Sequence, residues 1–468
     1  MNIQQLYTKC LAQGAYYIES DGIAAVVDPL RDVNEYLALA EKNNAQIKYI
    51  FETHFHADFV SGHLALQQAT GATIVYGPTA QTHFDSYIAK DNETFSIGKL
   101  SIKTLHTPGH TLESTCWLLI DEQGNPNSLF SGDTLFIGDV GRPDLAQKTG
   151  SITMEDLAGM LYDSLQSKII PLPNEVIVYP AHGAGSACGK NMSSDTFDTL
   201  GNQKSSNYAL KAANKEQFIK EVTEGLLPPP AYFPENVQLN KKGYDSLEKI
   251  MEKGLETIQP NQLKSILLNN TGALILDTRS PQIFKDGFLQ GSINIGIKGD
   301  FAPWVGTLIH DIKTPLVLVT APGEEKETIT RLCRVGYENI LGCVHPQVSD
   351  WKNAGLEVES ITSISAEELA TLFNEKEISI FDVRKQAEYN NGHIPGAYFA
   401  SLQFIDQHFP SFSPNETHYV HCQGGYRSMI ACSILQRKGI KNIIDVAGGY
   451  ANITKTNIPQ EKTSCATA

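Results

Sequence analysis

The sequence has no long hydrophobic run and no segment typical of a secretion signal. Its longest apolar stretches, such as Ile23–Val27 and Leu316–Val319, are far shorter than the roughly 18 residues that a membrane-spanning helix needs. The N-terminal segment Met1–Tyr7 lacks a basic region followed by an apolar one. We therefore expect neither a membrane partner nor a signal peptide.

Basic residues are fewer than acidic residues. The 468 residues include 37 Lys and Arg against 52 Asp and Glu, a formal net charge of −15. Phosphate backbones repel a surface of this sign unless a local basic groove offsets it. Because the sequence has no dense run of Lys and Arg, we expect no nucleic-acid partner.

Closely paired cysteines are also absent. The eight cysteines show no Cys-x-x-Cys spacing, and disulfide frameworks are typical of short secreted chains. These residues are therefore expected to be free thiols in a reducing cytoplasm. Two of them, Cys188 and Cys422, are considered further below. The other six are interpreted as ordinary small thiols: Cys10, Cys116, Cys333, Cys343, Cys432 and Cys465.

The chain does contain enough apolar material for several domains, with 41% hydrophobic residues. Its length predicts about three domains. The first segment alternates β-type apolar runs with His-, Asp- and Gly-rich loops, then Phe218, Val222 and Leu226 recur at a helical spacing. Pro228–Pro230 follow, and the stretch to Asn236 is predicted to be a stiff connector. We place the first boundary near residue 240.

The remainder is an internal duplication. Ile-Leu-Asp-Thr-Arg at Ile275–Arg279 returns as Ile-Phe-Asp-Val-Arg at Ile380–Arg384, an offset of 105 residues from Asp277 to Asp382. In both copies a strand-like run leads through a loop into a helix, which predicts parallel α/β domains over 250–357 and 360–458. Two glycines follow each aspartate at matching distances: Gly287 and Gly291, then Gly392 and Gly396.

Histidines and aspartates follow several predicted strands of the first segment. Thr53–Phe59 reads Thr-His-Phe-His-Ala-Asp-Phe and comes directly after a strand-like run. Later Pro-Gly-His, Ser-Gly-Asp and Pro-Ala-His turns each present one more side chain. Imidazoles together with carboxylates bind divalent metals, so the set predicts a metal site. Its members are His54, His56, Asp58, His110, Asp133 and His182.

These motifs resemble the metallo-β-lactamase superfamily, whose signature is His-x-His-x-Asp-His, over about residues 1–190. The resemblance implies an αββα fold over 1–240, including the helical connector. Phe59 stands in the place of the last signature histidine. In two-zinc hydrolases such as glyoxalase II, that histidine and the residue matching Asp58 help to hold the second metal. A complete two-metal site is therefore not expected.

The segment Gly138–Asp144 resembles a Gly- and Arg-containing segment of persulfide dioxygenases. That resemblance implies one Fe(II) per chain, with zinc as the alternative, held by His54, His110 and Asp133. Two imidazoles and one carboxylate leave coordination positions open for substrate and dioxygen. The remaining members of the set then orient ligands and water: His56, Asp58 and His182.

Two further residues are substrate-binding candidates. Arg142 is expected to hold either Asp144 or an anionic substrate, with a loop-stabilising ion pair as the equal alternative. Cys188, six residues after His182, is a candidate to face the substrate channel and handle a sulfane sulfur. A small buried thiol is the alternative for Cys188.

Cys422 follows the strand-like Tyr419–His421 and opens the loop Cys-Gln-Gly-Gly-Tyr-Arg-Ser before a helix. Backbone amides and a helix N-terminus favour the nucleophilic thiolate. The Cys-x4-Arg spacing to Arg427 is one residue shorter than in tyrosine phosphatases, which suits a single sulfur atom. Residues 360–458 resemble a rhodanese domain, which implies that Cys422 forms a persulfide in a catalytic loop that includes Arg427.

The first copy has no cysteine in the matching loop, Val319–Glu325, and carries two glutamates there. We expect it to serve packing, orientation or assembly.

As a whole, the chain resembles bacterial fusions of a persulfide dioxygenase with tandem rhodanese domains. The resemblance implies oxidation of a small thiol persulfide by O2 to sulfite. At Cys422, sulfur transfer then forms thiosulfate or regenerates the substrate. The alternatives are a glyoxalase II-like thioester hydrolase with an appended sulfurtransferase, or a non-catalytic sulfur carrier or sensor. A homo-oligomer is expected.

Overall fold

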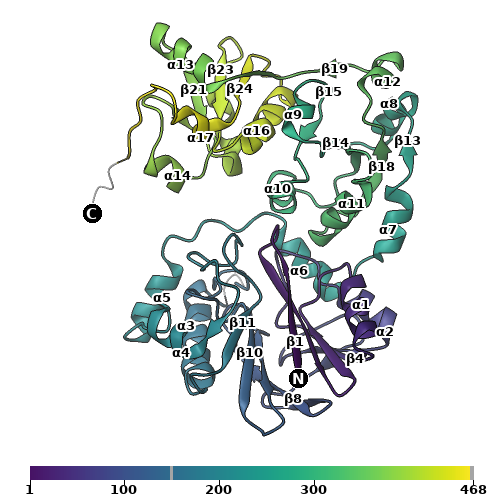
Figure 1. The fold of residues 1–468 in the computed structure, drawn as a ribbon, viewed down its shortest axis with the longest axis vertical. Helices are drawn as coiled ribbons and strands as arrows, with labels where there is room; N and C mark the ends of the chain where they lie inside the picture. Colours follow the sequence, from purple (N-terminus) through teal and green to yellow (C-terminus); the bar gives the residue numbers. More distant parts are fainter. Residues whose placement is uncertain (148–150, 464–468) are drawn as a thin grey trace. The chain divides into compact units, whose positions relative to one another are not determined.

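The computed structural model describes residues 1–147 and 151–463 (Figure 1). It divides into two compact units. The first contains Met1–Glu248 together with Leu332–Gly336, and the second contains Lys249–Arg331 and the chain from Tyr337 onward. Cys465 lies outside the described residues. Within the described part of the chain, no helix is both long and apolar enough to cross a bilayer.

The first unit contains two six-stranded sheets. Reading across each sheet, the strand orders are β1-β2-β3-β4-β5-β6 and β12-β11-β10-β9-β8-β7. The strands of the first sheet are β1 (Asn2–Thr8), β2 (Gln13–Ser20), β3 (Ile23–Val27), β4 (Gln46–Phe51), β5 (Thr73–Tyr76) and β6 (Tyr87–Ile88). Those of the second are β7 (Thr94–Ile97), β8 (Leu100–His106), β9 (Thr115–Ile120), β10 (Pro126–Gly132), β11 (Ile177–Pro180) and β12 (Asp198–Thr199).

Helices cover the outer faces of both sheets (Figure 1). The helices beside the first sheet are α1 (Asn34–Lys42) and α2 (His63–Thr70). The later helical segments are α3 (Met154–Ser164), a short π-helix (Leu165–Ile169), α4 (Leu200–Ser206), α5 (Lys215–Thr223) and α6 (Phe233–Lys242). Helix α7 (Leu247–Gly254) spans the division between the two units.

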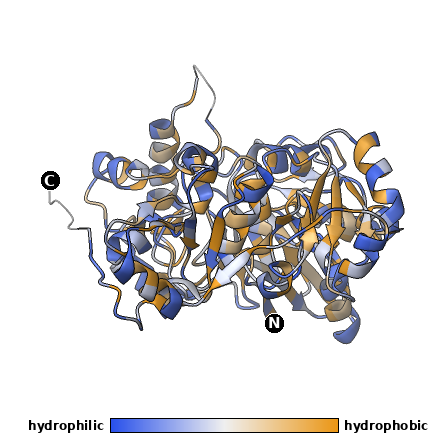
Figure 2. Ribbon diagram, turned by 90° about the horizontal axis from the view of Figure 1, so that it is seen from above, coloured by the Kyte–Doolittle hydropathy of each residue, from blue (hydrophilic) through white to orange (hydrophobic). Residues whose placement is uncertain are grey.

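Alternating burial along the strands builds this sandwich. In β2, Tyr16 and Ile18 pack into the core between the sheets, whereas Ala15 and Tyr17 pack on the opposite face with residues of α1 and α2. A third core joins the second sheet to helices α3 and α5. Two-residue periodicity sends successive side chains to opposite faces, and Figure 2 shows the strands as mostly hydrophobic segments. The layers are αββα, as the sequence predicted.

The proline-rich segment differs from the prediction. Helix α5 ends at Thr223, so Leu226 is not part of it, although Phe218 and Val222 are buried as expected. The stretch from Pro228 to Asn236 was predicted to be a stiff connector, and α6 begins inside it with Pro234 in its first turn. A proline there loses no helical hydrogen bond, because the first N–H groups of a helix have no intrahelical acceptor.

The second unit contains two five-stranded sheets in which every neighbouring pair is parallel. The first has the order β13-β18-β17-β14-β16 and the second β20-β24-β23-β21-β22. The first sheet is made of β13 (Thr257–Ile258), β14 (Leu274–Asp277), β16 (Ile293–Asn294), β17 (Leu316–Val319) and β18 (Ile340–Val344). The second is made of β20 (Thr362–Ile364), β21 (Ser379–Asp382), β22 (Tyr398–Phe399), β23 (His418–His421) and β24 (Ile443–Val446).

Helices flank the strands of both copies, and a small pair of strands, β15 (Phe288–Leu289) and β19 (Val358–Glu359), accompanies the first. Helices of the first copy are α8 (Pro260–Asn269), α9 (Pro281–Phe284), α10 (Phe301–Leu308), α11 (Glu325–Arg334) and α12 (Val348–Asn353). Those of the second are α13 (Ala366–Glu375), α14 (Gln386–Asn391), α15 (Ile405–His408), α16 (Tyr426–Arg437) and α17 (Gly449–Ile453), with two short 3₁₀ turns at Leu402–Phe404 and Phe409–Ser411. Equivalent strands occupy equivalent positions, so the duplication is confirmed.

A buried network explains the repeated Asp, Arg and Gly positions. Arg279 pairs with Asp277 and donates to the carbonyl oxygen of Gly287 at 3.0 Å. In the second copy, Arg384 pairs with Asp382 and donates to the carbonyl oxygen of Gly392 at 2.7 Å. Each arginine therefore ties the end of one strand to the loop ten residues later.

Replacing Arg279 by methionine should lower the free energy of unfolding of the second unit by about 3 kcal/mol, because Asp277 becomes a buried charge without a partner. The double variant Asp277→Leu, Arg279→Met should cost less than the single one. Urea unfolding of the full chain, followed by circular dichroism, measures both. Equal losses in the two variants would contradict this account of the network.

Candidate metal centre and cysteine site

The histidines and aspartates of the first unit lie just after strands β4, β8, β10 and β11. The structure brings one subset together: His54, His110 and Asp133 are all buried and offer ligand atoms within 4.8 Å of one another. The Nε2 atoms of His110 and His54 lie 3.5 and 3.8 Å from Oδ2 of Asp133. The loops at these strand ends therefore place the three predicted ligands around one point.

The polar atoms of this subset fit a bound divalent metal. Nδ1 of His54 lies 3.0 Å from the Thr53 hydroxyl, and Nδ1 of His110 lies 2.9 Å from the carbonyl oxygen of Arg142. These contacts leave both Nε2 atoms facing Oδ2 of Asp133, which is buried and has no hydrogen-bond partner among the residues that the structure describes. A buried carboxylate oxygen without a partner is costly, and a metal ion is a suitable partner for it.

The protonation states also suit ligation. Burial by itself raises the pKa of Asp133, but the imidazoles of His182 and His54 outweigh it and hold the pKa well below its usual range. Burial, reinforced by His56, lowers the pKa of His54. An ionised carboxylate and a neutral imidazole are the forms that bind a metal.

The segment Gly138–Asp144 supports two of these ligands. The N–H of Gly141 donates to the carbonyl oxygen of Asp133 at 2.9 Å, and the carbonyl oxygen of Arg142 accepts from His110. A Cβ atom on Gly141 would clash with the Asp133 backbone and lie 2.8 Å from Nδ1 of His110. Position 141 therefore requires glycine, because the loop could not otherwise approach Asp133 and His110 this closely.

The guanidinium of Arg142 is fully engaged within its own surroundings. It donates to both carboxylate oxygens of Asp144 at 2.6 and 2.7 Å, and to the carbonyl oxygens of Ala187 and Leu227 at 3.1 and 2.6 Å. The side chain is only 5% exposed. Of the two predicted roles, this arrangement supports the loop-stabilising ion pair.

A second subset lies beside the first. His182 contacts Asp133 through Nδ1 and Asp58 through Nε2, each at 2.8 Å. The thiol of Cys188 offers its sulfur within 4.8 Å of ligand atoms of Asp58 and His182. Burial raises the pKa of Cys188, and the carboxylates of Asp58 and Asp133 raise it further. The thiol is therefore next to the metal centre, in its protonated form.

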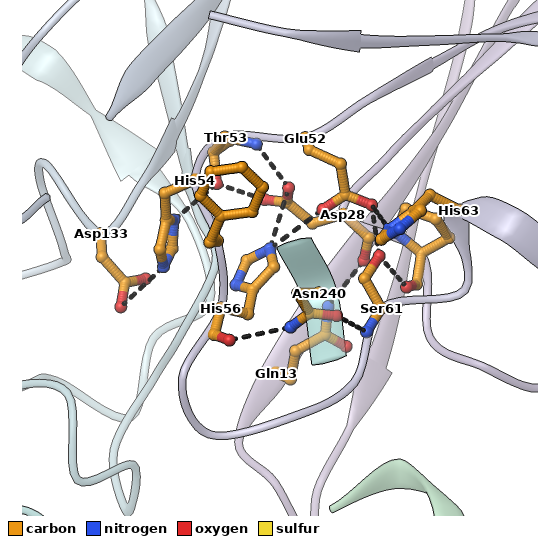
Figure 3. A network of polar contacts seen from close by, with 12 residues as sticks. Gln13, Asp28, Glu52, Thr53, His54, His56, Ser61, His63, Asp133 and Asn240 are labelled. Carbon is orange, nitrogen blue, oxygen red and sulfur yellow. Dashed lines mark hydrogen bonds and ion pairs between the residues drawn. The ribbon is translucent and has the colours of Figure 1, made fainter. Parts of the chain in front are cut away.

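His56 lies in a different acidic cluster from the predicted ligands (Figure 3). Its Nε2 atom is 3.1 Å from Asp28 and 3.4 Å from Glu52, and its ring stacks on Phe59 with 4.2 Å between centroids. Burial lowers the pKa of His56, but Asp28 and Glu52 overcome this and raise it to about 10. His56 contacts the predicted metal ligands through the ring of His54.

Residues outside the predicted set hold the signature loop. Asp28 accepts hydrogen bonds from the backbone N–H and the hydroxyl of Thr53, both at 2.8 Å. The side chain of Asn240, from helix α6, donates to the carbonyl oxygens of His56 and Phe59, both at 2.8 Å. Asp28 directly follows a buried strand, and this position could have marked it in the sequence as a candidate site residue. Asn240 is nearly 200 residues away, and no local pattern marks it.

A cavity of about 610 Å³ opens beside the signature loop. Its lining mixes aromatic, amide and charged side chains, and a small organic thiol fits a space of this size. The lining includes Phe55, Ala57, Glu113, Phe233, Gln238 and Lys241.

Cys422 lies between strand β23 and helix α16 and is only 1% exposed. The N–H of Gly425 donates to its sulfur at 3.1 Å. Arg427 forms a two-pronged ion pair with Glu388 at 2.6 and 2.8 Å, and Glu388 was not among the predicted site residues. A cavity of about 350 Å³ lies against Gln423, the next residue along the loop.

In the first copy, the matching loop borders a cavity of about 360 Å³ lined partly by Thr320 and Cys343. Burial, reinforced by Glu325, raises the pKa of Cys343 to about 12. This thiol is protonated at neutral pH, so it does not replace the missing nucleophile.

Comparison with known proteins agrees with this architecture. Residues 9–182 match the model of the metallo-beta-lactamase superfamily, and residues 259–354 and 365–456 each match the rhodanese-like domain. A solved metallo-beta-lactamase from Staphylococcus aureus is 30% identical, covers 74% of this chain and 99% of its own, and superposes with a TM-score of 0.65. The chain belongs to the metallo-beta-lactamase superfamily and carries two rhodanese domains after that domain.

Curated relatives match only part of this chain. "Glyoxylase B2" of Dictyostelium discoideum is 30% identical over 45% of this chain and 75% of its own length. A "probable hydroxyacylglutathione hydrolase" of Schizosaccharomyces pombe is 32% identical over 34% of this chain. The chain spans only 58% of that relative's length.

Metal content distinguishes a one-metal from a two-metal site. We expect His110→Ala to remove nearly all bound metal, and Asp58→Asn to leave about one metal per chain, because only His110 belongs to the triad. Phe59→His should add a second zinc, since it restores the missing signature ligand beside Asp58 and His182. Inductively coupled plasma mass spectrometry gives the stoichiometry. Two metals in the unaltered protein, reduced to one by Asp58→Asn, would contradict the one-metal arrangement.

Proposed function

We propose that this chain is an iron-dependent persulfide dioxygenase joined to a sulfurtransferase. It would oxidise a low-molecular-weight thiol persulfide with O2 to sulfite and transfer sulfane sulfur at Cys422. The observation that carries the proposal is the meeting of two imidazole Nε2 atoms and one unpartnered carboxylate oxygen at a single buried point. Fe(II) held by His54, His110 and Asp133 would supply open positions for dioxygen and sulfur.

The surrounding residues support a one-metal site. Phe59 occupies the signature position whose histidine would ligate a second ion, and its ring instead stacks on His56. Gly141 and Arg142 hold Asp133 and His110 through backbone contacts. Such outer contacts fix the orientation of metal ligands and tune their basicity.

The substrate side of the reaction fits the neighbouring cavity. Phe55 and Phe233 offer apolar surface to the carrier, while Gln238 and Lys241 offer polar contacts to its charged ends. In the overall reaction, a persulfide, O2 and water give the parent thiol and sulfite. The terminal sulfur is oxidised and O2 is reduced, so no further oxidant is needed.

The cysteine site completes the sequence of steps. The Cys422 thiolate takes the outer sulfur of a thiol persulfide, whose S–S bond breaks to release the parent thiol. The persulfide formed on Cys422 transfers that sulfur to sulfite, so its S–S bond breaks as the S–S bond of thiosulfate forms, and Cys422 returns as a thiolate. The Gly425 N–H at 3.1 Å stabilises that charge. Two sites on one chain raise the effective concentration of the shared intermediate.

A thioester hydrolase is the second candidate, because the curated relatives carry hydroxyacylglutathione hydrolase and glyoxylase names. Its second metal would require Asp58 and His182 with a further ligand. Phe59 supplies none, so the ligand that remains within reach of both is the thiol of Cys188.

Oxygen uptake tests the proposal. Anaerobically iron-loaded protein given glutathione persulfide should consume O2 and release sulfite or thiosulfate. His110→Ala should lose at least about 99% of this rate, since a triad member is missing, whereas His83→Ala, at an exposed histidine, should keep it. Cys422→Ser should retain oxygen uptake and release sulfite without thiosulfate. Thioester hydrolysis by zinc-loaded protein, with no oxygen uptake, would favour the hydrolase.

A further inference from the structure

The loop that carries Cys422 is intrinsically flexible. Between Cys422 and helix α16 it contains Gln423 and two consecutive glycines, and Gly425 has a φ of +97°. Glycine loses more conformational freedom on ordering than any other residue. The N–H of Gly425 nevertheless has to remain on the Cys422 sulfur for the thiolate to be stabilised. Contacts from outside the loop must therefore hold its C-terminal end, next to helix α16.

Tyr426, the residue after Gly425, is anchored on the other rhodanese copy of the same unit. Its hydroxyl donates to the carbonyl oxygen of Gly296 at 2.7 Å. A Cβ atom on Gly299 would lie no more than 2.8 Å from three atoms of the Tyr426 ring, and one on Gly296 would lie 3.3 Å from the ring. The two glycines of the first copy thus make a cleft that the tyrosine ring fills.

The first copy also fixes the shape of this cleft. Arg331 of helix α11 donates to the carbonyl oxygen of Ile297, between the two glycines, at 2.7 Å. Nearby, the N–H of Asn294 donates to the hydroxyl of Ser433 on helix α16 at 3.0 Å. At the far end of helix α16, Arg437 donates to the carbonyl oxygen of Gly291. Helix α16 and the loop that precedes it are therefore held at three points by the copy that has no cysteine in its loop.

The internal duplication shows that these glycines are not required by the fold. The matching positions of the second copy, 105 residues later, hold Ser401 and Phe404. The alignment is secure, because Ile297 and Leu402 donate equivalent backbone hydrogen bonds to Thr278 and Val383. Glycine at position 299 therefore serves the Tyr426 ring and not the backbone of the domain.

We propose that the cysteine-less copy is a positioning partner of the catalytic loop, holding Tyr426 in the Gly296–Gly299 cleft so that the Gly425 N–H stays on Cys422. Tyr426 is a positioning residue, since its contacts are with the first copy. Arg427, held by Glu388, fixes the same loop from the other side. The inference rests on the proposed sulfurtransferase role of Cys422 for its effect on catalysis, but not for its effect on the loop.

A double-mutant cycle in the full-length chain tests this. Gly299→Ala should lower kcat for sulfur transfer from thiosulfate to cyanide by about tenfold, because a displaced loop misplaces the reacting sulfur. In a Tyr426→Ala background the same change should have less than about a twofold effect, since nothing is left to clash with. Tyr426→Phe, which keeps the ring, should retain kcat within about threefold.

Hydrogen–deuterium exchange gives a second readout that needs no activity. Gly299→Ala should speed exchange of the peptide that contains Cys422–Tyr426 and leave strand β21 unchanged. The control is Gly254→Ala, whose added Cβ would lie 3.0 Å from Ile329 and away from Tyr426; it should leave that peptide unchanged.

Equal effects of Gly299→Ala with and without Tyr426, or loop exchange that does not respond, would overturn the positioning role. Absence of sulfur transfer in the unaltered protein would instead remove the proposed function, while the exchange experiment would still decide the inference.

Discussion

The arrangement of the candidate metal centre in the first unit depends on the carboxylate of Asp133. One of its oxygens accepts from His182, and the other faces His54 and His110 without a hydrogen-bond partner. A buried charge of this kind is stable only when charges or a metal compensate it. The close approach of Gly141 and the acidic cluster around His56 both hold loops that surround this group.

The cysteine site likewise depends on contacts from residues outside its own loop. Cys422 lies in a glycine-rich loop whose order comes from Arg427 on one side and Tyr426 on the other. In both units, the chemically reactive group lies on a loop, and its geometry comes from contacts made by residues distant in sequence. This division is typical of functional sites on rigid scaffolds.

Comparison of the two rhodanese copies separates fold from function. Both keep the buried Asp–Arg–Gly network, because it ties strand to loop in each domain. Only the second has a cysteine in this loop, the proposed nucleophile Cys422, and only the first has glycine at the two positions that contact Tyr426, Gly296 and Gly299. Positions that differ between the copies therefore mark the separate tasks of each, whereas shared positions mark the architecture.

The sequence by itself determined the duplication, because repeated local motifs record it, and its motifs implied the layered architecture through their resemblance to a known family. Residues at strand ends also predicted His54, His110 and Asp133 as metal ligands. The sequence also indicated Phe59 as a departure from the signature. Only the tertiary structure decided that Arg142 is engaged by Asp144, that His56 lies against Asp28 and Glu52, and that Asn240 and Tyr426 hold distant loops. Those contacts join residues far apart in the chain, and no local spacing records them.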